Sequence, residues 1–272
     1  MRRAPASRIW PRLAAAAWAA VLVAAFVAAD PPRKIRVLVD PGHGGKDAGA
    51  IGWKRTKEKD VNLRTALDLA KRLRETGLFD VRLTRSKDVF VTLPNRCRLA
   101  NEWKADLFVS IHANYAHDRR EKGSEVYFLS DHASDPEAAR LAEVENAADA
   151  GPPDPSRDGE VAQSILGVMA RTENLNRSSK LAATLALALK KKTALSSRGV
   201  KQASLYVLHW TDSPAALVEM GFISNRRDAA RLRSSSFRNK IAKALASGIV
   251  EYVRSKEFVE QMRQGSVTAG TR

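Results

Sequence analysis

The segment Val37–Ala50, VLVDPGHGGKDAGA, joins an apolar run to a glycine-rich turn. The run Ile35–Asp40 has the β-branched and aliphatic composition of a strand. The glycines that follow let the backbone turn tightly where the strand ends. Because α/β sheets bind ligands at the carboxyl ends of their strands, we expect His43 to point into a cleft there.

Outward from this segment, short apolar strands alternate with helical patterns. This alternation predicts one α/β domain with a mixed or parallel sheet of about six strands, flanked by helices. The predicted strands are Ile35–Asp40, Asp80–Arg85, Asp106–Ala113, Ser124–Ser130, Ser204–His209 and Ala215–Met220. The predicted helical stripes, each expected to pack on the sheet, are Leu63/Leu67/Ala70/Leu73, Leu181/Leu185/Leu189 and Ile241/Leu245/Ile249.

Residues 131–178 interrupt the alternation with a helical insertion. A helix is predicted over Pro136–Ala150, with Asp135 as its N-cap and Gly151–Pro152 ending it. A second helix is predicted over Gly159–Arg171. We expect the insertion to lie over the cleft.

The first 29 residues have the layout of a secretory signal peptide. Four arginines precede the apolar run Leu13–Ala29, and no acidic residue occurs before Asp30. Cleavage is expected after Ala29, which leaves no stable membrane span. An uncleaved anchor is the alternative, although the run is slightly short for the roughly 20 residues of a span. Export to the periplasm is the first expectation, and the cell wall or medium is the second.

Residues 30–256 form the predicted catalytic domain, and residues 257–272 a mobile tail. The net charge is +16, or +12 once the four arginines of the leader are removed. A basic chain favours anionic partners. The cations are scattered and the chain is expected to be exported, so we expect no nucleic-acid binding. The single cysteine, Cys97, excludes an intramolecular disulfide.

Three candidate metal ligands lie near the ends of strands: His43, Glu58 just before the first helix, and His112 in DLFVSIHANYA. Two imidazoles and one carboxylate make an open zinc site, whose fourth position holds a water of pKa about 7. Each residue alone has an ordinary structural explanation, and the chain has no contiguous metal motif. The residues by themselves leave a packed or solvated role open.

Glu219 ends an otherwise apolar strand in SPAALVEMGFISN. A buried unpaired charge costs several kcal/mol, so Glu219 is expected to face a polar site and to act as a general acid and base. The alternative is a structural acid paired with an arginine such as Arg96. Asp40 is expected either to orient a ligand histidine or to cap the turn.

The chain resembles the zinc-type N-acetylmuramoyl-L-alanine amidases, the group that includes the cell-separation amidases. The resemblance covers about Ile35 to Tyr252 and rests on six blocks in order: VDPGHGGKDAGA, EKDVNL, SIHAN, GSEVYFLS, VKQASLYVL and PAALVEMGFISN. It implies one zinc ion held by His43, Glu58 and His112, with Glu219 as the catalytic glutamate. The implied reaction is hydrolysis of the amide between N-acetylmuramic acid and L-alanine in peptidoglycan.

The cell-separation branch also implies regulation by the insertion. The helix Pro136–Ala150 would block the cleft and add a glutamate to the zinc until an activator protein displaces it. Glu145 is the first choice for that ligand and Glu143 the second, and both are otherwise exposed helix acids. Two other functions stay open: a zinc peptidase acting on stem peptides, and a non-catalytic peptidoglycan-binding module.

Overall fold

Six strands form one mixed sheet in the computed structural model, which describes residues 33–147, 165–256 and 258–260. The strands are β1 (Ile35–Pro41), β2 (Phe79–Leu83), β3 (Leu107–Asn114), β4 (Ser124–Leu129), β5 (Ser197–Ala203) and β6 (Ala215–Phe222). Their order is β2-β1-β3-β6-β4-β5. Only the pairing of β4 with β6 is antiparallel. The predicted six-stranded α/β fold is therefore confirmed.

The predicted strand Ser204–His209 is wrong. Its last four residues form the short helix α7 (Tyr206–His209), and the fifth strand lies just before it. Periodicity cannot separate a strand from a buried helical turn over so short an apolar run. The true strand, β5, reads SRGVKQA because it is an edge strand, and three of its seven residues are exposed.

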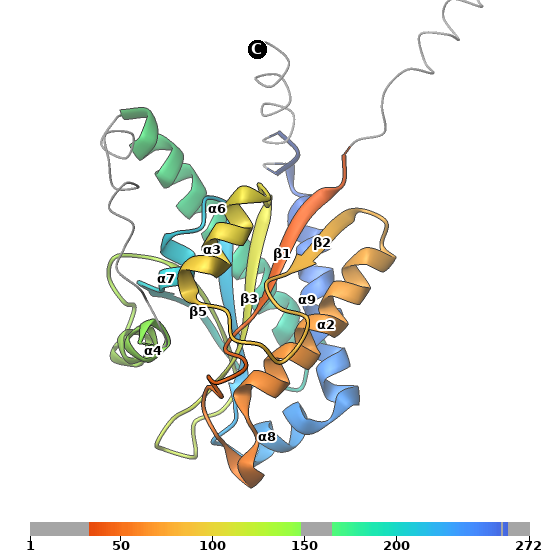
Figure 1. Ribbon diagram of the computed structural model, residues 1–272, viewed down its shortest axis with the longest axis vertical. Coiled ribbons are helices and arrows are strands. Elements are labelled where there is room, and N and C mark those ends of the chain that lie inside the picture. Colours follow the sequence, from red (N-terminus) through yellow and green to blue (C-terminus); the bar gives the residue numbers. More distant parts are fainter. Residues whose placement is uncertain (1–32, 148–164, 257, 261–272) are drawn as a thin grey trace, which may run out of the picture. The chain divides into compact units, whose positions relative to one another are not determined.

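Helices cover both faces of the sheet (Figure 1). The other helices are η1 (Trp53–Arg55), α2 (Glu58–Glu75), α3 (Leu93–Glu102), α4 (Pro136–Asn146), α6 (Ile165–Lys192), α8 (Arg226–Arg233) and α9 (Ser235–Val253). One core joins α2, α6 and α9 to the sheet, and a second joins α3, α4 and α7 to the opposite face. None of the described helices has the length and apolar composition needed to cross a membrane.

Two of the three predicted helical stripes pack as expected. The stripe Leu181/Leu185/Leu189 of α6 and the stripe Ile241/Leu245/Ile249 of α9 are fully buried. Burial stabilises the fold by about 1.5–3 kcal/mol for each such side chain. On α2 the prediction was displaced, since Leu67 is 39% exposed while Leu69 is fully buried. The buried face of α2 is thus rotated away from Leu67, whose side chain lies at the edge of that face.

The insertion contains two described helical parts. Asp135 caps α4 as predicted, since its carboxylate accepts a hydrogen bond of 2.9 Å from the Ala138 amide. The predicted end at Gly151–Pro152 lies outside the described residues, as do residues 159–164 of the predicted second helix. That helix does not end near Arg171, because α6 continues without a break to Lys192.

Alternation along the strands places polar side chains on the face covered by α3, α4 and α7. Leu38 and Phe108 belong to the core on that face. Side chains two and four positions further along a strand point to the same side. Asp40 on β1 and His112 on β3 therefore lie on this face, at the carboxyl ends of their strands, as does Glu219 on β6.

Candidate metal centre

The turn after β1 places His43 against His112. His43 adopts the left-handed region, with φ of 59°, and the two glycines after it also have positive φ. A Cβ on Gly42 would lie 2.2 Å from Nε2 of His112. Glycine at position 42 is thus required for the close approach of the two imidazoles, whose ring centroids are 4.9 Å apart.

Two buried guanidinium groups hold this turn by its backbone carbonyls. Arg85 donates hydrogen bonds to the carbonyl oxygens of Pro41 at 3.0 Å and of Gly42 at 2.8 Å. Arg96 donates to the carbonyls of Pro41 at 2.8 Å and of His43 at 2.9 Å. The strained conformation at His43 persists because these contacts fix the backbone on both sides of it.

Glu58 is the first residue of α2, and its carboxylate is fixed by backbone and side-chain donors. Oε2 accepts from the Ala50 amide at 3.0 Å. Oε1 accepts from the Ala113 amide at 3.1 Å and from Asn62 Nδ2 at 3.0 Å. Each oxygen also lies 3.1 Å from a histidine: Oε2 from Nε2 of His43 and Oε1 from Nδ1 of His112.

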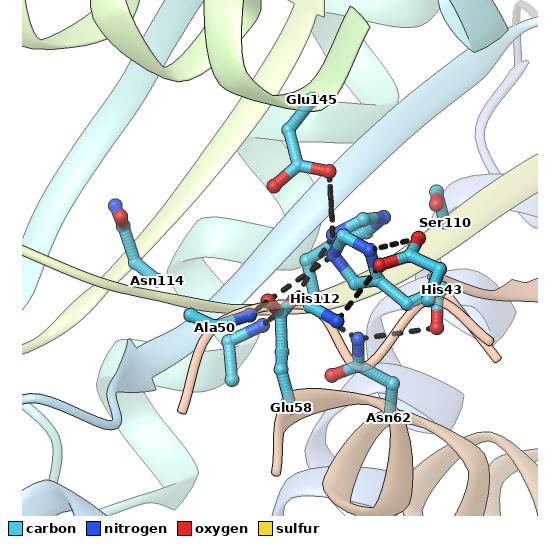
Figure 2. Close-up of polar contacts among 12 residues, drawn as sticks. His43, Ala50, Glu58, Asn62, Ser110, His112, Asn114 and Glu145 are labelled. Carbon is cyan, nitrogen blue, oxygen red and sulfur yellow. Dashed lines mark hydrogen bonds and ion pairs between the residues drawn. The ribbon is translucent and has the colours of Figure 1, made fainter. Parts of the chain in front are cut away.

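Glu145 joins these three residues from α4. Its Oε2 atom lies 3.5 Å from Nε2 of His43 and 3.2 Å from Nδ1 of His112. Figure 2 shows this side chain reaching from α4 toward the two histidines. One donor atom from each of the four residues lies within 4.8 Å of the others. Glu143 is exposed and is not part of the group.

The imidazoles and carboxylates of the four groups shift one another's pKa values in opposite directions. Burial opposes protonation of His43, but Glu58 and then Glu145 raise its pKa well above the ordinary value. Against the same effect of burial, Glu145 and Glu58 raise the pKa of His112 to about 10. Burial also opposes ionisation of Glu145, yet His112 and His43 lower its pKa to about 2. A metal binds neutral imidazoles, so its binding would release any proton that these histidines carry.

The donor set fits a metal ion such as zinc. Nitrogen and carboxylate donors in this number are those zinc uses in proteins. Nε2 of His43 is buried and makes no hydrogen bond to any described residue. The other ring nitrogen, Nδ1, lies 2.7 Å from Asp47 Oδ2, which fixes the orientation of the ring. These four residues could therefore bind a metal, with Asp47 supporting His43 from behind.

Glu219 lies beside this group on β6. It is the register neighbour of His112 across the β3–β6 ladder. It is fully buried, and neither of its carboxylate oxygens has a hydrogen-bond partner among the described residues. Burial, reinforced by Glu58 and Glu145, outweighs the opposing effect of His112 and raises the pKa of Glu219 well above the ordinary value. Glu219 is thus a carboxyl with a raised pKa beside the four candidate ligands.

Arg96 does not pair with Glu219, so the alternative role for Glu219 as its partner is wrong. Arg96 lies 2.5 Å from Oδ1 of Asp40 instead. Within the described residues no hydrogen bond or ion pair joins Asp40 to a histidine, and its carboxylate is held by Arg96, Thr84 and Ser110. The expectation that Asp40 orients a ligand histidine is therefore also wrong.

A sequence profile described as N-acetylmuramoyl-L-alanine amidase (Amidase_3) matches residues 37–251. This chain belongs to that family. The amidase AmiA of Escherichia coli strain K12 is 39% identical over 219 residues, which cover 79% of this chain and 75% of AmiA. AmiC of Escherichia coli O6:H1 is 36% identical over 222 residues, which cover 81% of this chain and 53% of AmiC. The chain thus spans about half the length of that second relative.

Solved amidases share the fold of this chain. The catalytic domain of CwlV from Bacillus (Paenibacillus) polymyxa has a TM-score of 0.61 and 30% identity, with 82% of this chain and 99% of CwlV covered. An N-acetylmuramoyl-L-alanine amidase from Clostridium difficile 630 has a TM-score of 0.63 at 24% identity, with 82% and 98% covered. The second likeness bears on the fold alone.

In this member of the amidase family, α4 forms one wall of a cavity beside the four-residue group. The cavity has a volume of about 400 Å³ and is lined on one side by His43 and Glu58 and on the other by Leu141, Val144 and Glu145 of α4. Both ends of α4 are tied to the domain.

At its amino end, α4 is joined to β5 by ion pairs. Glu137 pairs with Arg198 at 2.5 Å and with Lys201 at 2.9 Å, and both cations also pair with the buried Glu125. At the other end, Asn146 donates to the Ser204 carbonyl at 2.8 Å. The helix is thereby held where Glu145 meets the histidines.

Two supporting residues, Asp47 and Asn62, escaped the sequence analysis. Asp47 carries a readable signal, since it follows His43 by four residues in the same glycine-rich turn. The sequence signal for Asn62 is weaker. Asn62 lies one helical turn after Glu58, so its side-chain amide can reach the Glu58 carboxylate.

Proposed function

We propose that this chain is a zinc-dependent N-acetylmuramoyl-L-alanine amidase that cleaves peptidoglycan between the lactyl group of N-acetylmuramic acid and the first L-alanine of the stem peptide. His43, Glu58 and His112 would hold the zinc ion. The observation that carries the proposal is Glu219, a buried carboxyl without a hydrogen-bond partner in the described chain, in register with a ligand histidine. The family supplies the substrate class.

The roles of the residues follow from their positions. When bound, zinc supplies a Lewis acid that brings the pKa of a coordinated water to about 7. Glu219 accepts a proton from the attacking water and then donates it to the leaving amine of alanine. Its raised pKa makes the carboxylate a stronger base for the first of these transfers. Asp47 and Asn62 keep His43 and Glu58 in place throughout.

The test is hydrolysis of a soluble muropeptide by the purified chain, followed by mass spectrometry. We expect stem peptides with a free amino-terminal alanine, loss of this product after chelation, and its return when zinc is added. A matched reaction on free tetrapeptide separates the alternatives. Cleavage within the tetrapeptide would instead identify a peptidase, and binding of peptidoglycan without any cleavage would identify a binding module.

We also propose that α4 inhibits the enzyme by placing Glu145 on the metal. In support, Glu145 Oε2 lies within 3.5 Å of both histidine nitrogens that face Glu58. A fourth protein ligand would occupy the position that an open catalytic site keeps for water. The ion pairs of Glu137 and the hydrogen bond of Asn146 would hold the helix in this inhibiting position.

Replacing Glu145 tests this inhibition. Glu145→Ala is expected to raise basal hydrolysis at least about tenfold, the ratio that corresponds to 1.4 kcal/mol. Glu143→Ala is the matched control, since Glu143 lies on the same helix but is exposed. Deletion of residues 135–158 should act in the same direction as Glu145→Ala. Equal activity of the wild type, both single variants and the folded deletion variant would refute the inhibitory role.

An activator protein is proposed to displace α4. The three most exposed large apolar side chains among the described residues are Val144 at 58%, Val168 at 54% and Met169 at 62%. They flank residues 148–164 in the sequence, so a partner that covers them would contact α4 directly. We further propose that the chain is exported, with the periplasm as its compartment, on the basis of the leader at residues 1–29. Fractionation of cells producing the full chain tests this localisation.

A further inference from the structure

A second cavity, of about 690 Å³, opens at the carboxyl edge of the sheet. It lies between the β1–α2 loop, the β3–β4 loop and the start of α8. Six of its lining residues are basic and none is acidic: Lys54, Arg119, Arg120, Lys122, Arg226 and Arg227. We call this the basic pocket.

Hydrogen bonds join the three segments around the basic pocket. The Trp53 amide donates to the Ile223 carbonyl at 2.8 Å. Nδ2 of Asn225 donates to the carbonyl of Arg119 at 2.8 Å. The Ala116 amide donates to Oγ of Ser224 at 3.1 Å. The pocket is thus built into the fold and does not depend on loose surface side chains meeting by chance.

The cations of the basic pocket differ in how much of their charge is already compensated by neighbouring groups. Arg120 forms a bidentate pair with Asp118, with three hydrogen bonds of 2.8–3.1 Å, so much of its charge is compensated. Lys54 and Arg226 lie over the ring of Trp53, at 4.7 Å and 5.8 Å from its centroid. These stacked cations keep their charge while the ring orients them. The field in the pocket is therefore positive.

The basic pocket adjoins the proposed catalytic site through one residue. Tyr115 lines this pocket and also the cavity that contains His43, Glu58 and Glu145. A substrate that extends away from the metal centre past Tyr115 would enter the basic pocket. The two cavities can therefore bind two parts of one extended molecule.

We infer, on the basis of the proposed amidase function, that the basic pocket binds the carboxylates of the stem peptide. The scissile amide joins two chemically different halves. The glycan half presents uncharged N-acetyl sugars, whereas the peptide half carries free carboxylates, which guanidinium and ammonium groups bind by charge-assisted hydrogen bonds. The positive pocket therefore assigns a direction: the peptide extends past Tyr115 toward Arg119 and Lys122, and the glycan extends the other way.

Binding of a free stem tetrapeptide to the full chain tests the inference without any need for activity. The probes are the tetrapeptide with free carboxylates and the same peptide with those carboxyls amidated, each titrated in an NMR experiment. The test variant is Arg119→Gln/Lys122→Gln. The control, Lys243→Gln/Arg254→Gln, removes the same charge beside a different cavity, near the carboxyl end of α2.

We expect the free-carboxylate peptide to bind at least about tenfold more tightly than the amidated one, and only the pocket variant to lose this preference. Equal binding of the two peptides would overturn the inference. An equal loss in both variants would also overturn it, since it would indicate a general field effect. Binding of polyphosphate to the pocket with no binding of the tetrapeptide would assign the pocket to phosphate polymers instead.

Hydrolysis of muropeptides supplies the second readout. The pocket variant is expected to raise KM for the free-carboxylate substrate while kcat stays close to that of the control variant. An unchanged KM in an active pocket variant contradicts the inference. Absence of hydrolysis by every protein would count against the proposed function alone, because the binding experiment would still decide about the pocket.

Discussion

Asp40 and Glu219 are two buried carboxylates on the same face of one sheet, and their surroundings are opposite. Asp40 is 1% exposed and accepts hydrogen bonds from Thr84 at 2.6 Å, Arg96 at 2.5 Å and Ser110 at 2.8 Å. Glu219 is fully buried and has no such partner among the described residues. Burial acts against ionisation of both, but Arg96 overcomes it and lowers the pKa of Asp40, whereas the pKa of Glu219 is raised.

The difference separates a carboxylate that stabilises the site from one that we propose takes part in the reaction. The ion pair of Asp40 fixes Arg96, which in turn holds the backbone of the His43 turn. Glu219 holds nothing in place, so its burial is a cost that the fold alone does not explain. Buried groups left unsatisfied in this way are candidates for chemistry.

Replacing Glu219 should have the largest effect on activity. Glu219→Gln keeps the shape of the side chain but removes its capacity to transfer a proton, and we expect hydrolysis to fall by about 10²–10⁴-fold. The melting temperature should not fall, since no hydrogen bond to a described residue is lost. Wild-type rates in the variant, measured on a soluble muropeptide, would refute a catalytic role for Glu219.

Replacing Asp40 should have the largest effect on stability. Asp40→Asn leaves the Arg96 guanidinium buried without its counter-charge, and we expect the free energy of unfolding to fall by about 3–5 kcal/mol. Urea denaturation measures this loss, with Asp88→Asn as the control, because Asp88 also pairs with a cation but is half exposed. A loss below about 1 kcal/mol, typical of surface pairs, would remove the contrast drawn between Asp40 and Glu219.

A single methyl group at Gly42 should weaken the metal site. The new Cβ of Gly42→Ala would meet the ring of His112 at 2.2 Å, so the imidazole could not keep its present position beside Glu58. We expect zinc affinity to fall about 10–100-fold, as for changes that misplace a ligand. The control is Gly77→Ala, where φ is positive and a Cβ would have no atom within 4 Å. Equal zinc affinity of both variants in a competition titration would show that the close approach at Gly42 is unimportant.

The smallest predicted effects are changes in the free energy of unfolding with pH, and they have opposite signs for Asp40 and Glu219. The folded pKa of Asp40 lies below its ordinary value of 3.8, so the stability it contributes is present above that pH and is lost as the pH falls through the lowered pKa. The loss caused by Asp40→Asn should shrink over the same range. The folded pKa of Glu219 lies above 4.5, so metal-free protein should lose stability as the pH rises, and Glu219→Gln should gain relative to it.

Urea titrations of the three proteins at a series of pH values measure both trends. Parallel pH dependence of Asp40→Asn and Glu219→Gln would mean that the two carboxylates have similar surroundings. That result would contradict the comparison.

The sequence predicted the parts of this structure in which pattern and burial agree. β3 is buried along its whole length, so its apolar run was readable. Edge strand β5 was missed because its exposed side chains are polar and no local pattern distinguishes it from a loop. The prediction that Glu145 joins the metal site came from the resemblance. The spacing of acids along a helix does not show that one of them contacts His43 and His112, which lie much earlier in the chain.

The alternative that paired Arg96 with Glu219 is wrong for a related reason. Several acids were available to Arg96, and the register of β1 with β3 places Asp40 beside Ser110 and within reach of Arg96. Asp47 was missed because its contact with His43 depends on the left-handed backbone of the turn. Such pairings arise from tertiary geometry, which the sequence pattern does not contain.

The most direct test of the account is digestion of purified peptidoglycan in ¹⁸O-labelled water by the zinc-loaded Glu145→Ala variant, with mass spectrometry of both products. We predict one ¹⁸O atom on the lactyl carboxylate of muramic acid and an unlabelled stem peptide with a free alanine amine, both absent when Glu219→Gln is added. Label within the peptide or on a sugar hydroxyl, or products that persist in the Glu219→Gln background, would contradict the account.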